Sequence, residues 1–149
     1  MAFLDEVVPF ADKEEGTVYE HLKRAVDFSM NHLGVHGMPA GLYADWNDCL
    51  RLGKAGESSF VAMQFYYAMT ILKKFAEYKG DTDYIAYLEE KQKQQGDVIN
   101  EFCWNEDRFI RGFTEAGETI GKRTDNEANM WLNPQSWSVI SGLATEEQT

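Results

Sequence analysis

Apolar residues recur at helical spacing in separate stretches of the chain. The first stretch runs from residue 18 to 33, where Thr17 and Glu20 have the form of a capping box and Gly34 follows at a position that commonly ends a helix. A longer stretch opens at Ser58, and its apolar residues fall on two opposite faces, which is typical of a helix buried on both sides. The pattern therefore predicts a layered helical assembly.

The second half of the chain continues this pattern with one interruption. Residues 82 to 102 predict a third helix with a charged outer face, and Asn133-Pro134 predicts the start of a fourth, because asparagine can cap a helix and proline tolerates its first position. Between them, apolar alternation on either side of residues 115–117 predicts a β-hairpin. We expect a mainly all-α fold of about four helices with one short hairpin.

The stretch from residue 34 to 56 keeps neither a helical nor a strand period. It holds five glycines and one proline, which indicates a long loop. Loops of this length inside compact domains are usually functional or disordered. The apolar and aromatic residues interleaved in this one argue against disorder, so a function is favoured.

Two carboxylates in this loop, Asp45 and Asp48, flank a tryptophan and an asparagine. A short acid in a loop most often caps a turn or pairs with a neighbour, here Arg51. However, Trp46 offers a flat apolar face for a sugar ring, and Asn47 can both donate to and accept from hydroxyls. An aspartic acid among aromatic groups would also keep its proton more readily, as a general acid requires. The segment is a candidate site for sugar chemistry.

Other functional motifs find little support in the sequence. Calcium-loop spacing fails because Cys49 stands where an acid is needed, and the three histidines lack the partners of a zinc site, so we expect no metal and only surface or local hydrogen-bonding roles for them. We interpret Cys49 as a small buried residue rather than a nucleophile, because a neighbouring carboxylate does not activate a thiol. Phosphate-binding loops and nucleophile elbows are absent, so no cofactor is expected.

Composition narrows the class of protein further. The 149 residues match one average domain, and we expect no second one. Fourteen basic against 25 acidic residues give a net charge of -11, which argues against nucleic acid and anionic membranes as partners. The N-terminus has no signal-peptide pattern, and no 18 consecutive apolar residues occur. Two cysteines without a disulfide framework favour a cytoplasmic location.

Three motifs in order, "ADWNDCL", "GES" at residues 56–58 and "NPQSWSVISG", resemble the catalytic domain of the inverting disaccharide phosphorylases of the cellobiose phosphorylase family (glycoside hydrolase family 94-like). The resemblance runs from "EGTVYEHLKRA" to "SGLA", nearly the whole chain. It implies an (α/α)6 barrel of twelve helices between two β-rich domains. Residues 1–149 would then be a fragment of that helical barrel.

The same resemblance implies the chemistry. Asp48 takes the role of general acid, Trp46 lines the glucosyl site, and Asp45 and Asn47 belong to the same substrate-binding motif. Phosphate, as co-substrate, attacks a β-linked disaccharide with inversion and gives a sugar 1-phosphate; cellobiose is our first guess. The family's phosphate-binding histidine and Thr-Gly pair would lie beyond Thr149, and an arginine and aspartate for the donor sugar before Met1. We therefore expect the chain alone to be inactive and the parent to be a homodimeric enzyme.

Two other interpretations stay open at this point. A hydrolase on a similar barrel would need a second carboxylate about 6.5–9.5 Å from Asp48 to activate water, and Glu127 or Glu57 are candidates. A non-catalytic carbohydrate-binding fragment would use Trp46 for stacking and would give Asp48 no chemical role. Dependence on phosphate separates the first alternative from a phosphorylase, and substitution of Asp48 separates the second.

Overall fold

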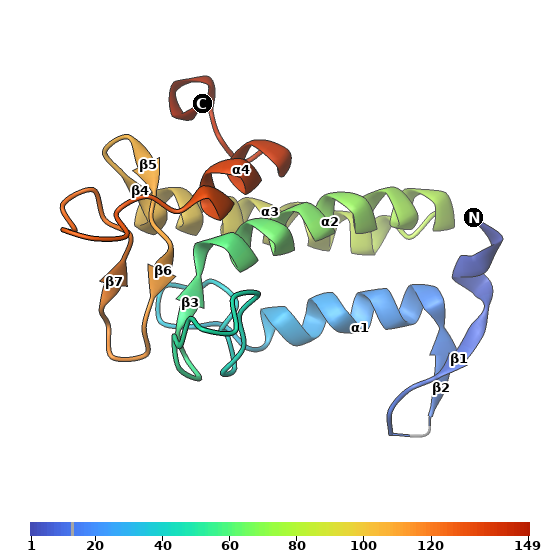
Figure 1. The fold of residues 1–149 in the computed structure, drawn as a ribbon. Helices are drawn as coiled ribbons and strands as arrows, with labels where there is room; N and C mark the ends of the chain where they lie inside the picture. Colours follow the sequence, from blue (N-terminus) through green and yellow to red (C-terminus); the bar gives the residue numbers. More distant parts are fainter. Residues whose placement is uncertain (13) are drawn as a thin grey trace.

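Helices dominate the computed structural model, which describes residues 1–12 and 14–149. Three are long: α1 (Val18–Met30), α2 (Ser59–Lys79) and α3 (Thr82–Cys103). Helix α2 runs antiparallel to α1 and α3, packs against both and makes its largest contact with α3 (Figure 1). A short helix, α4 (Leu132–Ile140), also packs on α2. The predicted layered helical arrangement is confirmed.

Short antiparallel strands complete the fold, and two of the three small sheets gather at the end of the long helices away from the N-terminus (Figure 1). The predicted hairpin is present, with Gly112 paired with Ile120 and Phe113 paired with Thr119. Two further hairpins were not predicted. The strands are β1 (Val7–Pro9) with β2 (Glu15–Thr17), β3 (Glu57–Ser58) with β6 (Gly112–Phe113) and β7 (Thr119–Ile120), and β4 (Trp104–Asn105) with β5 (Arg108–Phe109). Single 3-10 turns lie near each end, at Ala2–Asp5 and Glu146–Gln148.

Local signals set the ends of the long helices. The capping box of α1 forms as predicted, because the Thr17 hydroxyl accepts from the Glu20 amide at 3.2 Å while Glu20 accepts from the Thr17 amide at 2.6 Å. Ser58 caps α2 by accepting from the Val61 amide at 3.2 Å, and α2 stops where Gly80 adopts φ 69°. Helix α1 ends at Met30, earlier than predicted, because residues 31–39 fold back as a tight turn.

The core of the molecule has two parts that share α2. One part fills the space among the three long helices, and the other fills the space among α2, the end of α3 and the strands. The side chains of Phe65 and Met69 lie in the first part, and those of Ala62 and Met63 lie in the second. The predicted burial of α2 on both faces is therefore confirmed. The predicted core role of the aromatic run 65–67 is confirmed most fully for Phe65, which is 8% exposed.

The start of α4 differs from the prediction. The helix begins at Leu132 with Trp131 as its N-cap, and no side chain makes a capping hydrogen bond. Asn133 and Pro134 lie within the first turn instead. The Gln135 side chain fixes this end of the helix, because its amide accepts from the Phe109 backbone N–H at 2.9 Å and donates to the Phe109 carbonyl at 2.7 Å. A tertiary contact with β5, not a local cap, therefore decides where α4 starts.

Among the described residues, no helix combines the length and the apolar character needed to cross a bilayer.

Candidate active site

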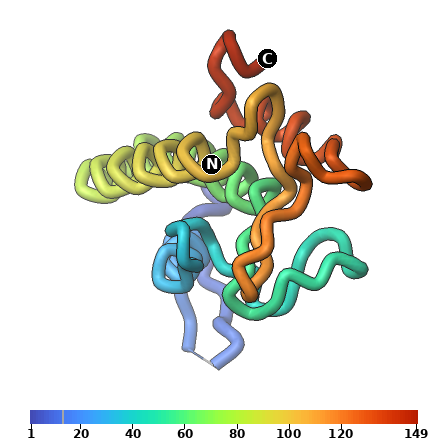
Figure 2. The backbone as a smooth tube through the Cα atoms, turned by 90° about the vertical axis from the view of Figure 1, so that its left-hand side faces the viewer, coloured from blue at the N-terminus to red at the C-terminus, as the bar shows by residue number. Residues whose placement is uncertain are grey.

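The loop that carries the two carboxylates projects from the helical body between the turn after α1 and the start of α2 (Figure 2, cyan to green). Its two arms are tied together near their base, where the Gly41 amide donates to Gly56 at 2.8 Å and the Leu42 amide donates to Lys54 at 2.9 Å. Leu42 and Tyr43 take up φ values of 52° and 69°, which turn the chain sharply into the acidic segment. The segment therefore leaves a closed, hydrogen-bonded stem.

Asp45 is the buried carboxylate of the site. Its Oδ1 forms an ion pair with the guanidinium of Arg111, and the two side chains are 0% and 1% exposed. The same oxygen accepts from the Asn47 amide at 2.9 Å. The expectation that an acid here caps a turn is confirmed for Asp45, but its ionic partner is Arg111 and not the neighbouring Arg51.

Asp48 is the exposed carboxylate of the site. It makes no hydrogen bond or ion pair with any residue that the structure describes, although the backbone on either side of it is held. Asn47 accepts from the Cys49 amide through its side chain at 3.1 Å and from the Leu50 amide through its carbonyl at 2.8 Å. The expectation that Cys49 is buried is wrong: its side chain is exposed, because this tip of the loop has no second layer over it.

A cavity of about 580 Å³ opens beside the two acids. Asp45 and Asp48 form part of its wall, together with Tyr43, Arg51 and small or aliphatic residues. The aromatic surroundings expected around the acid are thus limited here to Tyr43. The cavity combines one free carboxyl group with one guanidinium group, a pairing able to hydrogen-bond hydroxyls or an anion.

Trp46 points to a second cavity, of about 380 Å³, at the N-terminal ends of α2 and α4. Its ring packs edge-on against Phe60 at a centroid distance of 6.2 Å, and Phe60 packs edge-on against Trp137 at 5.9 Å. Trp46 as a residue is nevertheless 71% exposed, which leaves a face of its ring accessible to a ligand. Gln64 and Asn133 also line this cavity and add amide groups to an aromatic wall. Flat apolar faces beside amides are the groups that bind sugar rings.

Arg111 is the residue that sequence reasoning missed. It lies between β5 and β6, where its Nη1 donates to the Ser58 hydroxyl at 2.6 Å while Nη2 reaches Asp45. Its guanidinium also lies 5.8 Å from the centre of the Phe60 ring and 5.6 Å from that of Trp131. The available signal was a single arginine inside an apolar run, "FIRGF", because such a charge must find a partner when the run is buried.

Glu57, a candidate base for the hydrolase alternative, is already engaged by the protein. Its side chain is 2% exposed, and its carboxylate accepts from the backbone amides of His36 and Met38, the latter at 3.0 Å. The His36 ring nitrogen Nδ1 lies 2.5 Å from the same group. Glu57 therefore holds the turn after α1 and cannot activate a water in either cavity. Glu127 is exposed and lines neither of them.

The remaining histidines behave as the sequence predicts. The His21 Nε2 lies 3.1 Å from the Val8 carbonyl, and the His32 Nδ1 lies 2.7 Å from the Phe28 carbonyl. Over residues 1–12 and 14–149, no three histidine, cysteine or acidic side chains gather as metal ligands would.

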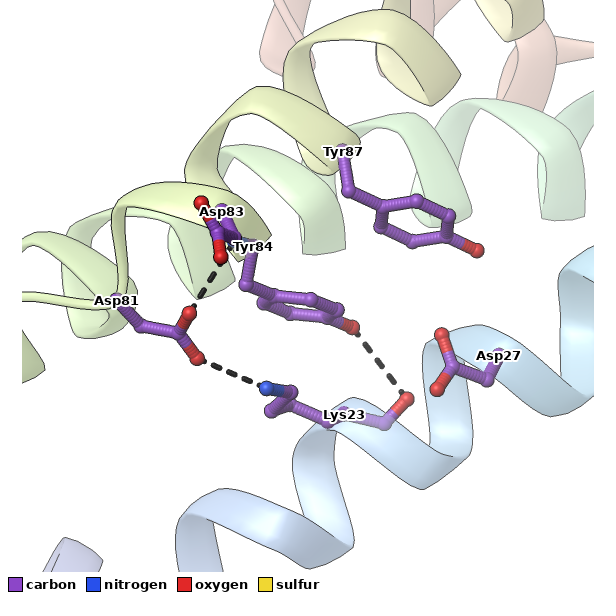
Figure 3. A pocket seen from close by; sticks show the side chains of 6 residues that line it. All are labelled: Lys23, Asp27, Asp81, Asp83, Tyr84 and Tyr87. Atoms are coloured by element: carbon purple, nitrogen blue, oxygen red, sulfur yellow. Dashed lines mark hydrogen bonds and ion pairs between the residues drawn. The ribbon is translucent and has the colours of Figure 1, made fainter.

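Another polar pocket, of about 620 Å³, lies between α1 and α3, outside the acidic loop. Figure 3 shows the rings of Tyr84 and Tyr87 extending from α3 toward α1. Lys23 binds Asp81 at 2.8 Å, and its ammonium group lies 4.2 Å from the centre of the Tyr84 ring. The hydrogen bond from Lys23 lowers the pKa of Asp81, and burial raises the pKa of Tyr84. Because Lys23, Asp81 and Tyr84 bind one another, we interpret these three residues as a structural clasp between the helices.

Comparison with known proteins identifies the family. The family model of the glycosyl hydrolase 94 superfamily, catalytic domain, matches residues 1–149. An N,N'-diacetylchitobiose phosphorylase of Vibrio proteolyticus is 36% identical over 149 residues, which cover 99% of this chain and 18% of that protein. A 3-O-beta-D-glucopyranosyl-beta-D-glucuronide phosphorylase of Paenibacillus borealis is 34% identical over 139 residues, 91% of this chain and 18% of that protein.

A cellobionic acid phosphorylase of Neurospora crassa is 32% identical over 151 residues, 99% of this chain and 19% of that protein. The chain thus spans about a fifth of the length of the curated relatives it matches. The match with the family model extends over all of its residues. The chain belongs to the glycosyl hydrolase 94 superfamily, within its catalytic domain.

Proposed function

We propose that this chain is part of a disaccharide phosphorylase and carries its general acid, Asp48. The observation that supports this most is the contrast within one motif. Asp45 is buried and paired with Arg111, whereas Asp48 is exposed on the wall of a cavity and has no partner among the described residues. A carboxyl group whose backbone is held in place, but which is not paired with another protein group, is free to transfer a proton to a substrate.

The proposed reaction needs a single protein carboxyl group. The protonated Asp48 gives its proton to the glycosidic oxygen as the bond to the anomeric carbon breaks, and a phosphate oxygen attacks that carbon from the opposite face. The products are a free sugar, which keeps the proton, and a sugar 1-phosphate of inverted configuration. In the synthetic direction, the carboxylate of Asp48 takes the proton back from the acceptor hydroxyl.

The hydrogen bonds that already occupy the carboxylate of Glu57 support phosphorolysis over hydrolysis. An inverting hydrolase needs a second free carboxylate about 6.5–9.5 Å from the acid, which activates water. Glu57 is buried and contacts the His36 amide, the His36 ring nitrogen and the Met38 amide. Asp45 is paired with Arg111. Phosphate is itself the nucleophile in a phosphorylase, so this second group is not required. The phosphorylase names of the relatives support the same choice.

In this proposal the sugar lies on the free face of Trp46. The cavity formed with Phe60 and Trp137 presents aromatic edges, and Gln64 and Asn133 present amides for hydroxyl groups. Trp46 and Asp48 are two residues apart on a loop braced at Asn47 and line different cavities, so we place one disaccharide across both, with a ring on Trp46 and the glycosidic oxygen at Asp48. We propose cellobiose as the first substrate to try, with N,N'-diacetylchitobiose and cellobionic acid as the next two.

The remaining proposals concern the whole protein. The exposed apolar side chains of α4, Leu132, Val139 and Ile140, support its placement in a larger (α/α)6 barrel, which would cover them. Groups for phosphate would come from outside residues 1–149, so we propose that the chain alone is inactive. A homodimeric parent enzyme belongs to the same proposal. So does a cytoplasmic location, which suits the free thiols of Cys49 and Cys103.

The test measures release of sugar 1-phosphate and of free sugar from cellobiose, with and without phosphate. It compares this chain, a polypeptide extended at both ends to the length of the relatives, and the extended protein with Asp48→Asn. Asp97→Asn, an exposed acid of α3, serves as the matched control. We expect phosphate-dependent activity only in the extended protein and its control, and a loss of at least about 100-fold in Asp48→Asn.

Two outcomes would overturn the proposal. Sugar release by the extended protein without phosphate identifies a hydrolase, and Glu127→Gln would then test its second carboxylate. Binding of each disaccharide without turnover, unchanged by Asp48→Asn, identifies a non-catalytic binding fragment.

A further inference from the structure

We propose that Arg111 is a positioning residue that fixes Asp48 through Asp45 and Asn47. This inference rests on the proposed role of Asp48 as the acid. Arg111 does not border the cavity beside Asp48, so it is not assigned a contact with substrate. It acts through a chain of hydrogen bonds that starts at Ser58 and ends at the backbone amide of Cys49, the residue after the acid.

The first step of the chain joins two distant segments. Arg111 lies 66 residues beyond Asp45 and forms an ion pair with its Oδ1. The other carboxylate oxygen of Asp45, Oδ2, is buried and accepts no hydrogen bond from the described residues. The position of Asp45 therefore depends on Oδ1 alone, and Arg111 is the charged group that holds it.

The second step passes from Asp45 to the acid. Its Oδ1 also accepts from the Asn47 amide at 2.9 Å, and the Asn47 side chain then accepts from the Cys49 amide at 3.1 Å. The first of these Asx turns spans residues 45–47 and leads into the second, which spans residues 47–49 and contains Asp48. The backbone on either side of Asp48 is therefore held while its carboxyl group stays free. A displacement of Asp45 therefore shifts Asp48 through Asn47.

Arg111 is itself held rigidly. Its backbone amide donates to the Ile120 carbonyl at 2.8 Å, and its carbonyl accepts from the Ser59 amide at 3.2 Å. Hydrogen bonds to β7 and to the start of α2 therefore hold the backbone of Arg111 on both sides. Its guanidinium reaches Ser58 with one nitrogen and Asp45 with another. Lysine has a single ammonium point charge and cannot reproduce this fork. Arg111 thus fixes Asp45 of the loop relative to β7 and the start of α2.

The test uses epistasis in the extended phosphorylase. Arg111→Lys should lower kcat for cellobiose phosphorolysis by about 10- to 100-fold with little change in KM, because a displaced acid affects the reaction step more than binding. In the Asp48→Asn background the same substitution should have no further effect, since no acid remains to be positioned. Arg123→Lys, in an exposed ion pair with Asp107, is the matched control and should leave kcat unchanged.

Hydrogen exchange gives a second measurement that does not depend on residual activity. Arg111→Lys should speed exchange at the amides of Asn47 and Cys49 while exchange in α3 stays as in the wild type. If Arg111→Lys fails to fold, Asn47→Ala breaks the second Asx turn without touching the buried ion pair, and it should show the same kcat loss and the same absence of effect in Asp48→Asn.

The proposal is wrong if Arg111→Lys, folded, keeps wild-type kcat and wild-type exchange. It is equally overturned by equal losses in the wild-type and Asp48→Asn backgrounds, which indicate general damage. Neither result contradicts the proposed function. That proposal fails only if the wild-type extended protein shows no phosphate-dependent turnover, or if Asp48→Asn retains this turnover.

Discussion

The carboxylate of Glu57 occupies the space that a side chain on Gly34 would need. A Cβ placed on Gly34 would lie 2.4 Å from the Cδ of Glu57, far inside van der Waals contact. The close approach lets the turn after α1 wrap around the carboxylate, so that the amides of His36 and Met38 both reach it. Glu57 in turn begins β3 and leads into α2. Gly34 and Glu57 together set the base of the acidic loop.

Gly34→Ala should therefore destabilise the protein. The added methyl group must displace either the buried carboxylate or the turn, and overpacking of this kind costs about 1–3 kcal/mol of unfolding free energy. Urea unfolding followed by circular dichroism measures the change. A midpoint equal to that of the wild type would show that the turn can relax without cost.

The clasp between α1 and α3 predicts a loss of stability in acid. The hydrogen bond from Lys23 lowers the pKa of Asp81 below its ordinary value of 3.8, and hydrogen bonds from the Tyr84 amide and the Tyr19 hydroxyl add to this effect. A carboxyl group whose pKa is lower in the folded state stabilises the fold above its unfolded pKa, and this stabilisation is lost as pH falls through the folded pKa. The contribution is therefore complete at neutral pH and fades below about pH 3.8.

Asp81→Asn measures this contribution. Its unfolding free energy should lie below that of the wild type at neutral pH, and the two curves should converge as the pH falls below about 3.8. Asp97→Asn removes an acid from an ion pair with Lys93 whose side chains are 63% and 76% exposed, so it is the matched control and should have little effect at any pH. Parallel curves for wild type and Asp81→Asn would contradict the assignment.

The two cysteines should differ in reactivity toward thiol reagents. Cys49 is exposed at the tip of the acidic loop, whereas Cys103 is fully buried and burial raises the pKa of its thiol. Because the thiolate is the reactive form, iodoacetamide at neutral pH should label Cys49 in the native protein and Cys103 only after denaturation. Mass spectrometry of the peptides measures both. Native labelling of Cys103 would mean that the end of α3 opens readily.

Trp46 should matter for sugar binding and not for folding. The residue is 71% exposed, so Trp46→Ala removes little buried surface and should change the unfolding free energy by less than about 0.5 kcal/mol. Loss of a stacking face should weaken disaccharide binding by about tenfold or more, measured by calorimetry on the extended protein. Tyr78→Ala, an exposed aromatic residue at the far end of α2, is the control. Equal affinities in wild type and Trp46→Ala would remove Trp46 from the sugar site.

The elements with local signals were predictable from the sequence. The capping box at Thr17, the cap at Ser58 and the left-handed Gly80 each lie within a few residues of the helix end that they define. The strands β4 and β5 were missed, since four consecutive polar residues, 105–108, separate Trp104 from Phe109 and show no apolar alternation. Helix ends with a capping residue nearby could therefore be predicted, and strands without a local signal could not.

The site was predictable only as a motif. Asp45 and Asp48 look alike in the sequence, and their difference comes from Arg111, which lies far along the chain and stands next to β6, the strand that pairs with β3. The start of α4 was misplaced for the same reason, because Gln135 finds its partners on β5. Burial of Cys49 was wrongly expected because the sequence does not show that the loop tip lacks a covering layer.

The double hydrogen bond between Gln135 and Phe109 has a consequence for association between molecules. The edge of a β-strand presents free N–H and C=O groups that invite another strand to pair with it. At Phe109 both groups are taken by one side-chain amide, which imitates the peptide unit of a neighbouring strand. The β4–β5 hairpin therefore has no free backbone hydrogen-bonding group at Phe109, and a second polypeptide cannot extend its sheet there without first displacing α4.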